Sequence, residues 1–285
     1  MAQTLKFGNK TWATKVGSTL AYNDENGNYK PLPFAFTRST SATRVNKEGL
    51  IEVVTNDRPR IDYTDTSDGV LLLEKAATNL ITYSEDFSNS YWTKSGASVV
   101  SGFTSPSADS PLGAFKLVEG TNNGAHFINT PHELSINGTA TTHIYAKKGE
   151  RNAIKLSTNG VILAGCYANF DLLNGVVSAS ALCTATIKSF GDYYKCSFTY
   201  ASNGATAPQS YLVLLKDATD STFQSYQGDG TSGVYIFGAM LEQNSVASSY
   251  IPTQGSASTR VAETASGSGN SEVFNDSEGV LFANI

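Results

Sequence analysis

The sequence has little charge and no long apolar run. Asp, Glu, Lys and Arg make up 16% of its 285 residues, whereas about a quarter is usual in soluble domains. Long exposed helices need charged residues on their outer faces, so the composition argues against a helical protein. The 25 glycines, 14 tyrosines and 14 phenylalanines instead suit strands joined by tight turns.

The charge balance excludes two classes of partner. The net charge is −5, and the densest basic stretch, residues 147–151, has an acid in its middle and is typical of a turn. A nucleic-acid-binding protein would show a basic patch, so no nucleic-acid partner is expected. No apolar run approaches the ~20 residues that span a bilayer, and residues 1–6 lack the pattern of a secretory signal, so no membrane partner is expected.

Residues suited to catalysis and metal binding are scarce. The three histidines, His126, His132 and His143, do not have the spacing of metal ligands. The three cysteines, Cys166, Cys183 and Cys196, include no CxxC pair, and we expect Cys196 to be a small buried apolar residue in an alternating run. No nucleophile elbow, phosphate-binding loop or dinucleotide fingerprint occurs. We therefore predict that the protein is not an enzyme.

Short apolar or alternating runs, bounded by turn signals such as Asn-Gly and Gly-Asp, fill most of the chain. They predict strands at residues 50–54, 60–63, 69–73, 114–118, 125–128, 142–146, 153–156, 161–170, 184–190, 193–200, 211–215 and 234–240. Eight or more strands at this spacing indicate an all-β sandwich or barrel. Residues 211–215 and 234–240 hardly alternate, which predicts that their second face is covered by another segment of the chain or by a neighbouring subunit.

The two ends of the chain differ from its centre. Residues 1–79 contain short, ragged strands and are predicted to form an irregular β-rich arm or small module that packs on a partner. Residues 262–271 have the composition of a linker. The apolar residues 279–285 are expected to be the first strand of a further domain, with a strand that swaps onto a neighbour as the alternative. The segments 40–45 (TSATRV) and 256–261 (SASTRV) are near-repeats, by chance or for a structural reason.

Several ordered motifs resemble those of bacteriophage virion proteins. They are FTRSTSATRVN at 36–46, RPRIDY at 58–63, GVLLLE at 69–74 and TNLITYSEDF at 78–87. From YWTK at 91–94 the chain resembles jelly-roll carbohydrate-binding modules, whose closing segments are similar to residues 234–242 and 249–253. The resemblance implies an all-β fold with a jelly-roll-like antiparallel β-sandwich at 80–255, an N-terminal anchoring region at 1–79, and a linker with a possible further strand at 256–285.

The resemblance also implies a function. It predicts a structural component of a phage particle, made in the host bacterial cytoplasm and located in the virion as a tail fibre, head fibre or capsid-attached protein. Its partners would be capsid, portal or tail proteins and further copies of the chain, with a trimer expected from phage fibres, and its jelly roll would aid attachment to the host. The alternatives are a module that binds host surface glycans, and a non-catalytic part of a polysaccharide-degrading enzyme.

Two sets of candidate site residues follow. Glycan binding needs exposed aromatic faces that stack on sugar rings, and the candidates are Tyr91, Trp92, Tyr193 and Tyr226. No cofactor is expected apart from a possible structural calcium, which jelly-roll modules of this kind often hold through oxygen ligands. Its candidate ligands are Glu85, Asp86 and Glu242. Hydrogen bonding at strand ends is the favoured role of these acids and calcium binding the second; the sequence also leaves open a carboxylate pair for glycoside hydrolysis, because the spacing of such a pair is set by the fold.

Overall fold

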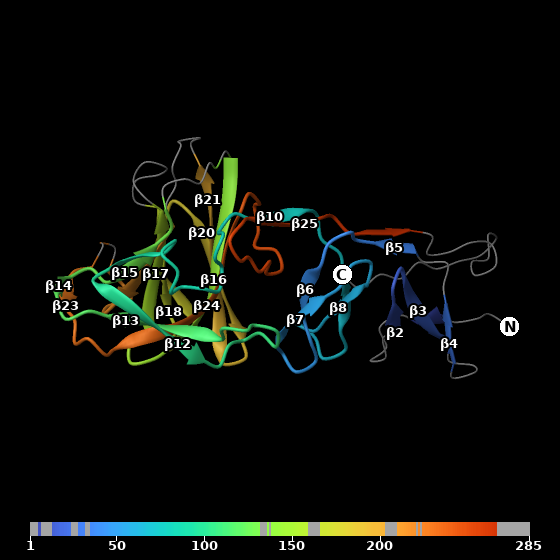
Figure 1. The fold of residues 1–285 in the computed structure, drawn as a ribbon, viewed down its shortest axis with the longest axis horizontal. Helices are drawn as coiled ribbons and strands as arrows, with labels where there is room; N and C mark the ends of the chain where they lie inside the picture. The colour runs from blue at the N-terminus through green and yellow to red at the C-terminus, as the bar shows by residue number, and fades with distance from the viewer. Residues whose placement is uncertain are drawn as a thin grey trace. The chain divides into compact units, whose positions relative to one another are not determined.

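The computed structural model describes residues 5–6, 13–23, 28–31, 35–131, 136, 138–158, 166–202, 210–220, 222 and 224–266, and every regular element in this part of the chain is a β-strand. The chain divides into two units (Figure 1). Unit 1 comprises Met1–Glu48, Glu52–Ala76 and Arg260–Ile285, and unit 2 comprises Gly49–Ile51 and Ala77–Thr259. In chain order, therefore, segments of unit 1 stand on both sides of unit 2.

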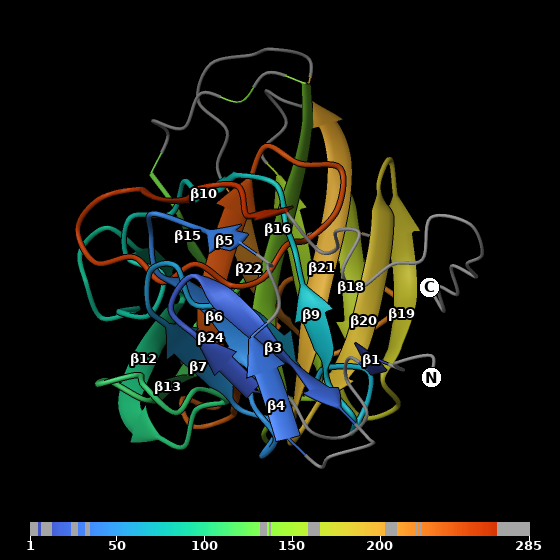
Figure 2. The same ribbon diagram turned by 90° about the vertical axis from the view of Figure 1, so that its right-hand side faces the viewer.

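Unit 2 is built on two antiparallel six-stranded sheets. We call one the β17 sheet, and its strand order is β11 (Thr93–Ser95), β15 (Phe127–Asn129), β22 (Ser210–Leu215), β17 (Ala153–Thr158), β18 (Tyr167–Asp171) and β19 (Val176–Ala181). The other is the β16 sheet, with the order β12 (Ala97–Phe103), β13 (Ala114–Glu119), β24 (Gly233–Glu242), β16 (Gly138–Lys148), β21 (Tyr193–Ser202) and β20 (Thr184–Phe190). Figure 2 shows β19 and β20, the last strands of the two sheets, side by side.

The main hydrophobic core draws on both sheets. The β16 sheet contributes Phe115, Leu117, Ile144, Phe198 and Ile236, among others. The β17 sheet contributes Ile154, Leu156, Phe170, Leu212 and Leu214. Two antiparallel sheets that share one apolar layer form a β-sandwich, which confirms the predicted fold class.

The unusual pattern of β24 has a local cause. The register between β16 and β24 shifts between His143 and Tyr145, opposite Gly238, whose φ of 62° favours glycine. This bulge reverses the alternation, so that Val234 and Ile236 before it, and residues 239 and 241 after it, all face the main core. The run looks apolar on both faces partly because the alternation changes phase in its middle.

The second faces of both apolar strands are covered by this chain itself. Tyr250 packs on the outer side of the β16 sheet, with its ring centroid 5.7 Å from that of Phe237 and 6.2 Å from that of Tyr145. On the β17 sheet, Val213 and Leu215 are 0% exposed, and Ala218, from the segment after β22, packs against them. The sequence analysis allowed two covers for these faces, another segment of the chain or a neighbouring subunit. Segments of this chain cover them, so these strands give no evidence of oligomerisation.

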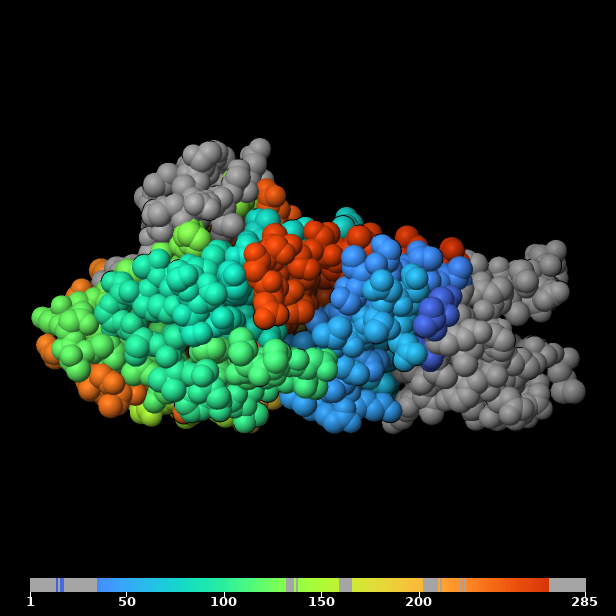
Figure 3. Space-filling model, viewed as in Figure 1, coloured from blue at the N-terminus to red at the C-terminus, as the bar shows by residue number. Residues whose placement is uncertain are grey.

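The residues that end unit 2 pack on those that begin it. Leu80 N donates to Leu241 O at 2.8 Å, and Gly255 N donates to Thr82 O at 2.7 Å. Figure 3 shows the orange-red segment that ends unit 2 against the blue-green residues that begin it. Two short pairs complete the unit, β10 (Ala77–Asn79) with β25 (Ser258–Arg260), and β14 (Asn123–Gly124) with β23 (Tyr226–Gln227).

The described part of unit 1 consists of short strands in three pairs and one four-stranded sheet. They are β5 (Ala35–Thr37) with β26 (Thr264–Ser266), β6 (Ala42–Val45) with β7 (Ile51–Val54), β8 (Arg60–Asp62) with β9 (Val70–Leu72), and β3 (Ser18–Asn23) with β1 (Leu5–Lys6), β2 (Ala13–Lys15) and β4 (Asn28–Pro31). The predicted linker at 262–271 is wrong for its described part, because Thr264–Ser266 is a strand paired with β5. Residues 267–285, with the strand predicted at 279–285, lie outside the described residues.

Candidate functional site

The aromatic residues predicted to stack on sugars are mostly buried. Trp92 is 4% exposed, Tyr193 5% and Tyr226 8%, and only Tyr91 is partly exposed. The Trp92 indole packs on Phe87 with 5.0 Å between ring centroids. A sugar needs an open ring face, so the prediction of a stacking platform is wrong for Trp92, Tyr193 and Tyr226.

The polar atoms of these rings bind the protein itself. Trp92 Nε1 donates a 2.8 Å hydrogen bond to Tyr83 O, and the Tyr193 hydroxyl donates to Thr104 O at 2.7 Å. Buried Trp and Tyr need such acceptors for their polar atoms. Both side chains therefore hold loops to the sandwich.

Tyr226 belongs to a group of charged and polar side chains that bind one another. Its hydroxyl donates to Glu119 Oε2 at 2.9 Å, and the same carboxylate accepts two 2.6 Å hydrogen bonds from Arg151. The Arg151 guanidinium lies 5.4 Å from the centre of the Tyr226 ring and Lys216 Nζ lies 5.5 Å from it. Burial raises the pKa of Tyr226, and the Glu119 hydrogen bond adds to the effect. The group is satisfied internally, which fits a structural role.

The three acids considered as calcium ligands do not come together. Glu85 accepts from Ser110 Oγ at 2.7 Å and from the Tyr250 hydroxyl at 3.1 Å. Asp86 accepts from the backbone N of Ser88 at 3.1 Å, two residues ahead.

Glu242 is 0% exposed and accepts from Ser248 N and Asn244 Nδ2, at 2.8 and 2.6 Å. In the part of the chain that the structure describes, no group of three His, Cys, Asp or Glu side chains could hold a metal ion. The prediction of a calcium site made of Glu85, Asp86 and Glu242 is therefore wrong, and the acids have the favoured role of hydrogen bonding in loops.

Two histidines and two cysteines are also inside the sandwich. His126 and His143 are both 0% exposed, Cys166 is 1% exposed and Cys196 0%, which confirms Cys196 as a buried apolar residue. His126 lies between two carbonyls, with Nε2 3.1 Å from Tyr226 O. His132 lies outside the described residues. No helix long and apolar enough to cross a membrane occurs in the described ranges.

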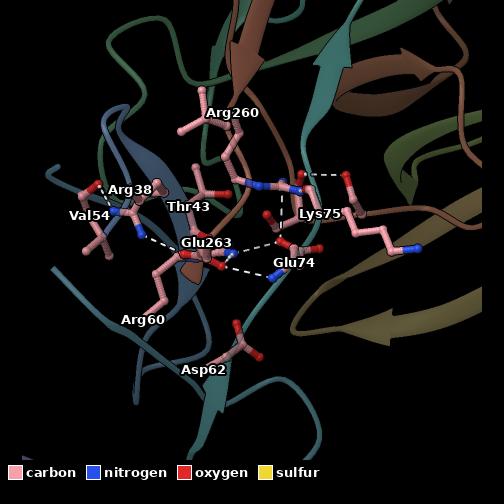
Figure 4. Close-up of polar contacts among 12 residues, drawn as sticks. Arg38, Thr43, Val54, Arg60, Asp62, Glu74, Lys75, Arg260 and Glu263 are labelled. Atoms are coloured by element: carbon pink, nitrogen blue, oxygen red, sulfur yellow. Dashed lines mark hydrogen bonds and ion pairs between the residues drawn. The ribbon is translucent and has the colours of Figure 1, made fainter. Parts of the chain in front are cut away.

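A buried cluster of charged side chains lies in unit 1, and the sequence did not predict it. Glu263 stands at its centre (Figure 4). Its carboxylate accepts from Arg38 NH1 at 2.7 Å and from Arg60 Nε at 2.7 Å. Arg60 also pairs with Glu74 at 2.9 Å, and Arg260 NH1 lies 3.2 Å from the same Glu74 oxygen.

The cluster is buried apart from the Glu74 side chain, which is 17% exposed. The side chains of Arg38, Arg60 and Glu263 are 0% exposed, and that of Arg260 is 1% exposed. Burial lowers the pKa of Arg60, but its hydrogen bonds to Glu263 and Glu74 outweigh burial and raise the pKa overall. Removing one partner of such a buried pair leaves an uncompensated charge, which costs about 3–5 kcal/mol.

The guanidiniums also bind backbone carbonyls. Arg38 NH2 donates to Val54 O at 3.1 Å and to Thr55 O at 2.6 Å, and Arg60 NH1 donates to Thr43 O at 2.7 Å. The cluster thus ties the segments around residues 38–43, 54–62, 74 and 260–263 into one unit. The guanidiniums of Arg38 and Arg60 bind acceptors of the protein itself. We therefore call the cluster a fastening, a buried polar group that holds chain segments together, and not an open ligand site.

The two near-repeats meet in this unit but have different roles. Val261 N donates to Thr40 Oγ1 at 3.1 Å. Arg44, from the first segment, pairs with Glu52 at 3.1 Å, and the two side chains are 25% and 36% exposed. Arg260, from the second, is buried beside Glu74. The repeat therefore does not reflect equivalent arginine contacts.

A second fastening lies in unit 2 and centres on Asn79. Its Nδ2 donates to Ala239 O at 3.2 Å and to Ile251 O at 2.8 Å. Its Oδ1 accepts from Ile81 N at 3.1 Å and from Leu241 N at 3.2 Å. One buried amide thus joins the start of the unit to β24 and to the segment after it.

Ser84 and Thr253 reinforce this fastening. Ser84 N donates to Thr253 Oγ1 at 3.0 Å, and Thr253 N donates to Ser84 Oγ at 2.8 Å. The Thr253 hydroxyl also donates to Ile81 O at 2.6 Å. These reciprocal bonds clip the motif at 78–87 to the motif at 249–253.

One outer face of the sandwich carries buried polar side chains. On the β17 sheet, Lys155 and Asn169 are direct register partners and are 2% and 0% exposed. Lys155 Nζ lies 4.6 Å from the centre of the Tyr167 ring, and burial lowers the pKa of Lys155. Asn169 Nδ2 donates to Ala218 O and to Asp220 O, both at 2.8 Å. The segment around 218–220 therefore covers this face.

Comparisons with known proteins find distant structural likenesses and no family. No protein-family model and no curated protein matches the chain. The matching solved structures include a CBM35 module from Paenibacillus barcinonensis, with 11% identity and a TM-score of 0.29 over 60% of this chain and 98% of that chain. The mannan-recognising module TmCBM27 matches with 12% identity and a TM-score of 0.29 over 61% and 98%.

A third similar structure comes from carbohydrate-binding modules of the β-sandwich superfamily with promiscuous specificity. It matches with 11% identity and a TM-score of 0.35 over 85% of this chain and 98% of that chain. At these identities and scores the likeness carries no argument about ligands.

Proposed function

We propose that the chain is a non-catalytic structural component of a bacteriophage particle, as a tail fibre, head fibre or capsid-attached surface protein. Unit 1 docks on capsid, portal or tail proteins, and the jelly roll of unit 2 is displayed for host attachment. The protein is made in the host bacterial cytoplasm and resides in the virion. It assembles with copies of itself, as a trimer by analogy with phage fibres.

The observation that carries the proposal is the place of the motif residues. The motifs that resemble virion proteins supply Arg38, Arg60 and Glu74 to the cluster of unit 1. They also supply Asn79 and Ser84 to the fastening of unit 2. The motif residues thus maintain the fold of both units and do not build a catalytic site, as expected of a structural component.

Analysis of purified particles tests the proposal. Mass spectrometry of virions purified by density gradient should find the chain at a fixed ratio to the capsid protein, and cryo-electron microscopy should locate its copies. A Glu263→Gln chain, in which unit 1 is weakened and unit 2 is intact, should be lost from the particles, whereas Glu52→Gln should be retained. If the chain is absent from intact particles, the proposal is wrong.

Glycan recognition by unit 2 is the second candidate. The observation that favours it is the combination of an amide, an ammonium group and an aromatic ring, Asn169, Lys155 and Tyr167, on one sheet face, because these groups bind sugars. A ligand would have to displace the covering segment around 218–220. A glycan array with the full chain should then show binding that Asn169→Ala reduces and Asn174→Ala leaves unchanged, and an array without binding removes this candidate.

A further inference from the structure

Two of the three cysteines face each other across neighbouring strands. Cys166 directly precedes β18, and Cys183 lies between β19 and β20. Cys183 Sγ donates to Tyr167 O at 3.2 Å, and Cys166 Sγ donates to Leu182 O at 3.7 Å. Each thiol thus contacts the carbonyl of the residue next to the other cysteine. Cys166 belongs to the main hydrophobic core and Cys183 packs against it, so the two side chains lie on the same, core-facing side of the strand pair.

The backbone between β19 and β20 is strained at the point that sets this geometry. Leu182 has a φ of 57°, in the left-handed region that is unfavourable for a residue with a branched side chain. Its side chain is 60% exposed, so burial does not explain the conformation. The turn passes the chain from the β17 sheet to the β16 sheet (Figure 2) and brings Leu182 O to the Cys166 thiol.

The two thiols differ in access to solvent. Cys166 is 1% exposed, whereas Cys183 is partly exposed. The contact with the Cys166 side chain lowers the pKa of Cys183, against the effect of partial burial. Cys183 is therefore the sulfur that an oxidant in solution meets first, and Cys166 is the one placed to react next.

Cys196 does not belong to this pair. It is 0% exposed and its thiol donates to Tyr194 O at 3.9 Å. Burial raises the pKa of Cys196, which keeps it protonated and unreactive. It serves as an internal control for thiol chemistry at the other two positions.

We propose that Cys166 and Cys183 form an intramolecular disulfide when the protein meets a disulfide oxidant such as oxidised glutathione. The Cys183 thiolate attacks one sulfur of the oxidant, forms a mixed disulfide and releases one glutathione thiolate. The Cys166 thiol then loses its proton and attacks the Cys183 sulfur, which forms the protein disulfide and releases the second glutathione. Two cysteines are oxidised, and one glutathione disulfide is reduced to two thiols.

The disulfide would cross-link the chain at the side of the sandwich where the edge strands of both sheets lie. It links the start of β18 to the crossing between β19 and β20, and β19 and β20 are edge strands of the two sheets. A chain made reduced in the cytoplasm and later released into an oxidising medium would gain this cross-link after folding. The inference stands independently of the phage proposal, because it depends on the geometry of the two thiols alone.

Mass spectrometry of the full chain tests the disulfide. The protein is incubated with oxidised glutathione, denatured, alkylated without reduction and digested. We expect a linked peptide containing Cys166 and Cys183, with Cys196 alkylated, and a melting temperature several degrees higher than that of the reduced protein. Dithiothreitol should reverse both effects. The Cys196→Ala variant should behave like the unaltered chain, and Cys183→Ser should give no linked peptide.

The Cys166→Ser variant distinguishes the order of the two steps. Without the second thiol, the mixed disulfide should persist as a glutathione adduct on Cys183. The proposal is overturned if the oxidised unaltered chain still carries alkylated Cys166 and Cys183, or if Cys183 links two chains instead. Both results are read on the unaltered protein, so they decide the question even if a variant fails to fold.

Discussion

Nε of Arg60 donates a 2.7 Å hydrogen bond to the carboxylate of Glu263, although 203 residues separate the two along the chain. Both side chains are 0% exposed. The contact joins two segments of unit 1 that are separated in the sequence by the sandwich of unit 2. The stability of unit 1 should therefore depend on one carboxylate that belongs to the far end of the chain.

Replacing Glu263 by Gln should destabilise unit 1 by about 3–5 kcal/mol, because Arg38 and Arg60 would lose the charge that compensates their burial. Hydrogen exchange measured by mass spectrometry should show faster exchange in residues 35–48 and 52–76 and unchanged protection in the sandwich. Glu52→Gln is the matched control. Glu52 pairs with Arg44 at the surface, so its loss should cost at most about 1 kcal/mol. Equal effects of the two variants would contradict the assignment.

A chain that ends after Thr259 should keep unit 2 and lose unit 1. This truncation removes Arg260 and Glu263 from the cluster and β26 from its pairing with β5. Limited proteolysis should then cut within residues 35–76 and leave a stable fragment that contains 77–259. Protection of residues 35–76 equal to that of the full chain would show that the C-terminal segment is dispensable.

Local patterns predicted the strands whose side chains are large. The run at 184–190 became β20 with the same ends, and the runs at 193–200 and 211–215 lie within β21 and β22. Branched and aromatic residues make such strands visible in a sequence. The structure also contains β19 at Val176–Ala181, which the sequence did not predict. Residues 177–181 alternate apolar and polar side chains, but these are small serines and alanines with little strand preference.

The polar sites were less predictable because burial is a property of the fold. Arg58 and Arg60 are two residues apart in one motif, yet Arg58 is exposed and Arg60 is 0% exposed. Nothing local distinguishes them, since the partner of Arg60 comes from residue 263. For the same reason Trp92 looked like a candidate for a sugar platform and proved to be core. The sequence offered one signal for the cluster, the charged residues that recur within the motifs. This signal identifies candidate residues but does not show which residues they pair with.

Replacing Asn79 by Ala should destabilise unit 2 by about 2–4 kcal/mol, because the side chain makes four hydrogen bonds in a buried site and each contributes about 0.5–1.5 kcal/mol. Urea unfolding followed by tryptophan fluorescence should report the loss, since Trp92 lies in the same core. Asn174→Ala is the control, because Asn174 is exposed. A loss below the size of a single hydrogen bond for Asn79→Ala would show that the fastening is redundant.

The sandwich should lose stability in mild acid through His143. This residue is 0% exposed, and neither ring nitrogen has a hydrogen-bond partner among the described residues. Burial, together with the positive charge of Lys195, lowers the pKa of His143 well below its ordinary value of 6.5. The unfolded chain therefore binds a proton that the folded chain does not. The stabilising effect is complete above about pH 6.5 and is lost as the pH falls towards the folded pKa, by at most about 1.4 kcal/mol per pH unit.

The His143→Leu variant isolates this contribution. Leucine carries no titrating group and suits an apolar site beside Tyr145 and Tyr250, whose ring centroids lie 5.9 and 6.5 Å from that of His143. Free energies of unfolding measured in urea between pH 5 and 8 should show a weaker dependence on pH in the variant than in the unaltered chain. Every other titrating group, His126 included, is common to both proteins, so the difference belongs to position 143. Parallel pH curves would mean that His143 stays neutral in both states over this range, or that the folded protein accommodates its proton without loss, and either result would contradict the prediction.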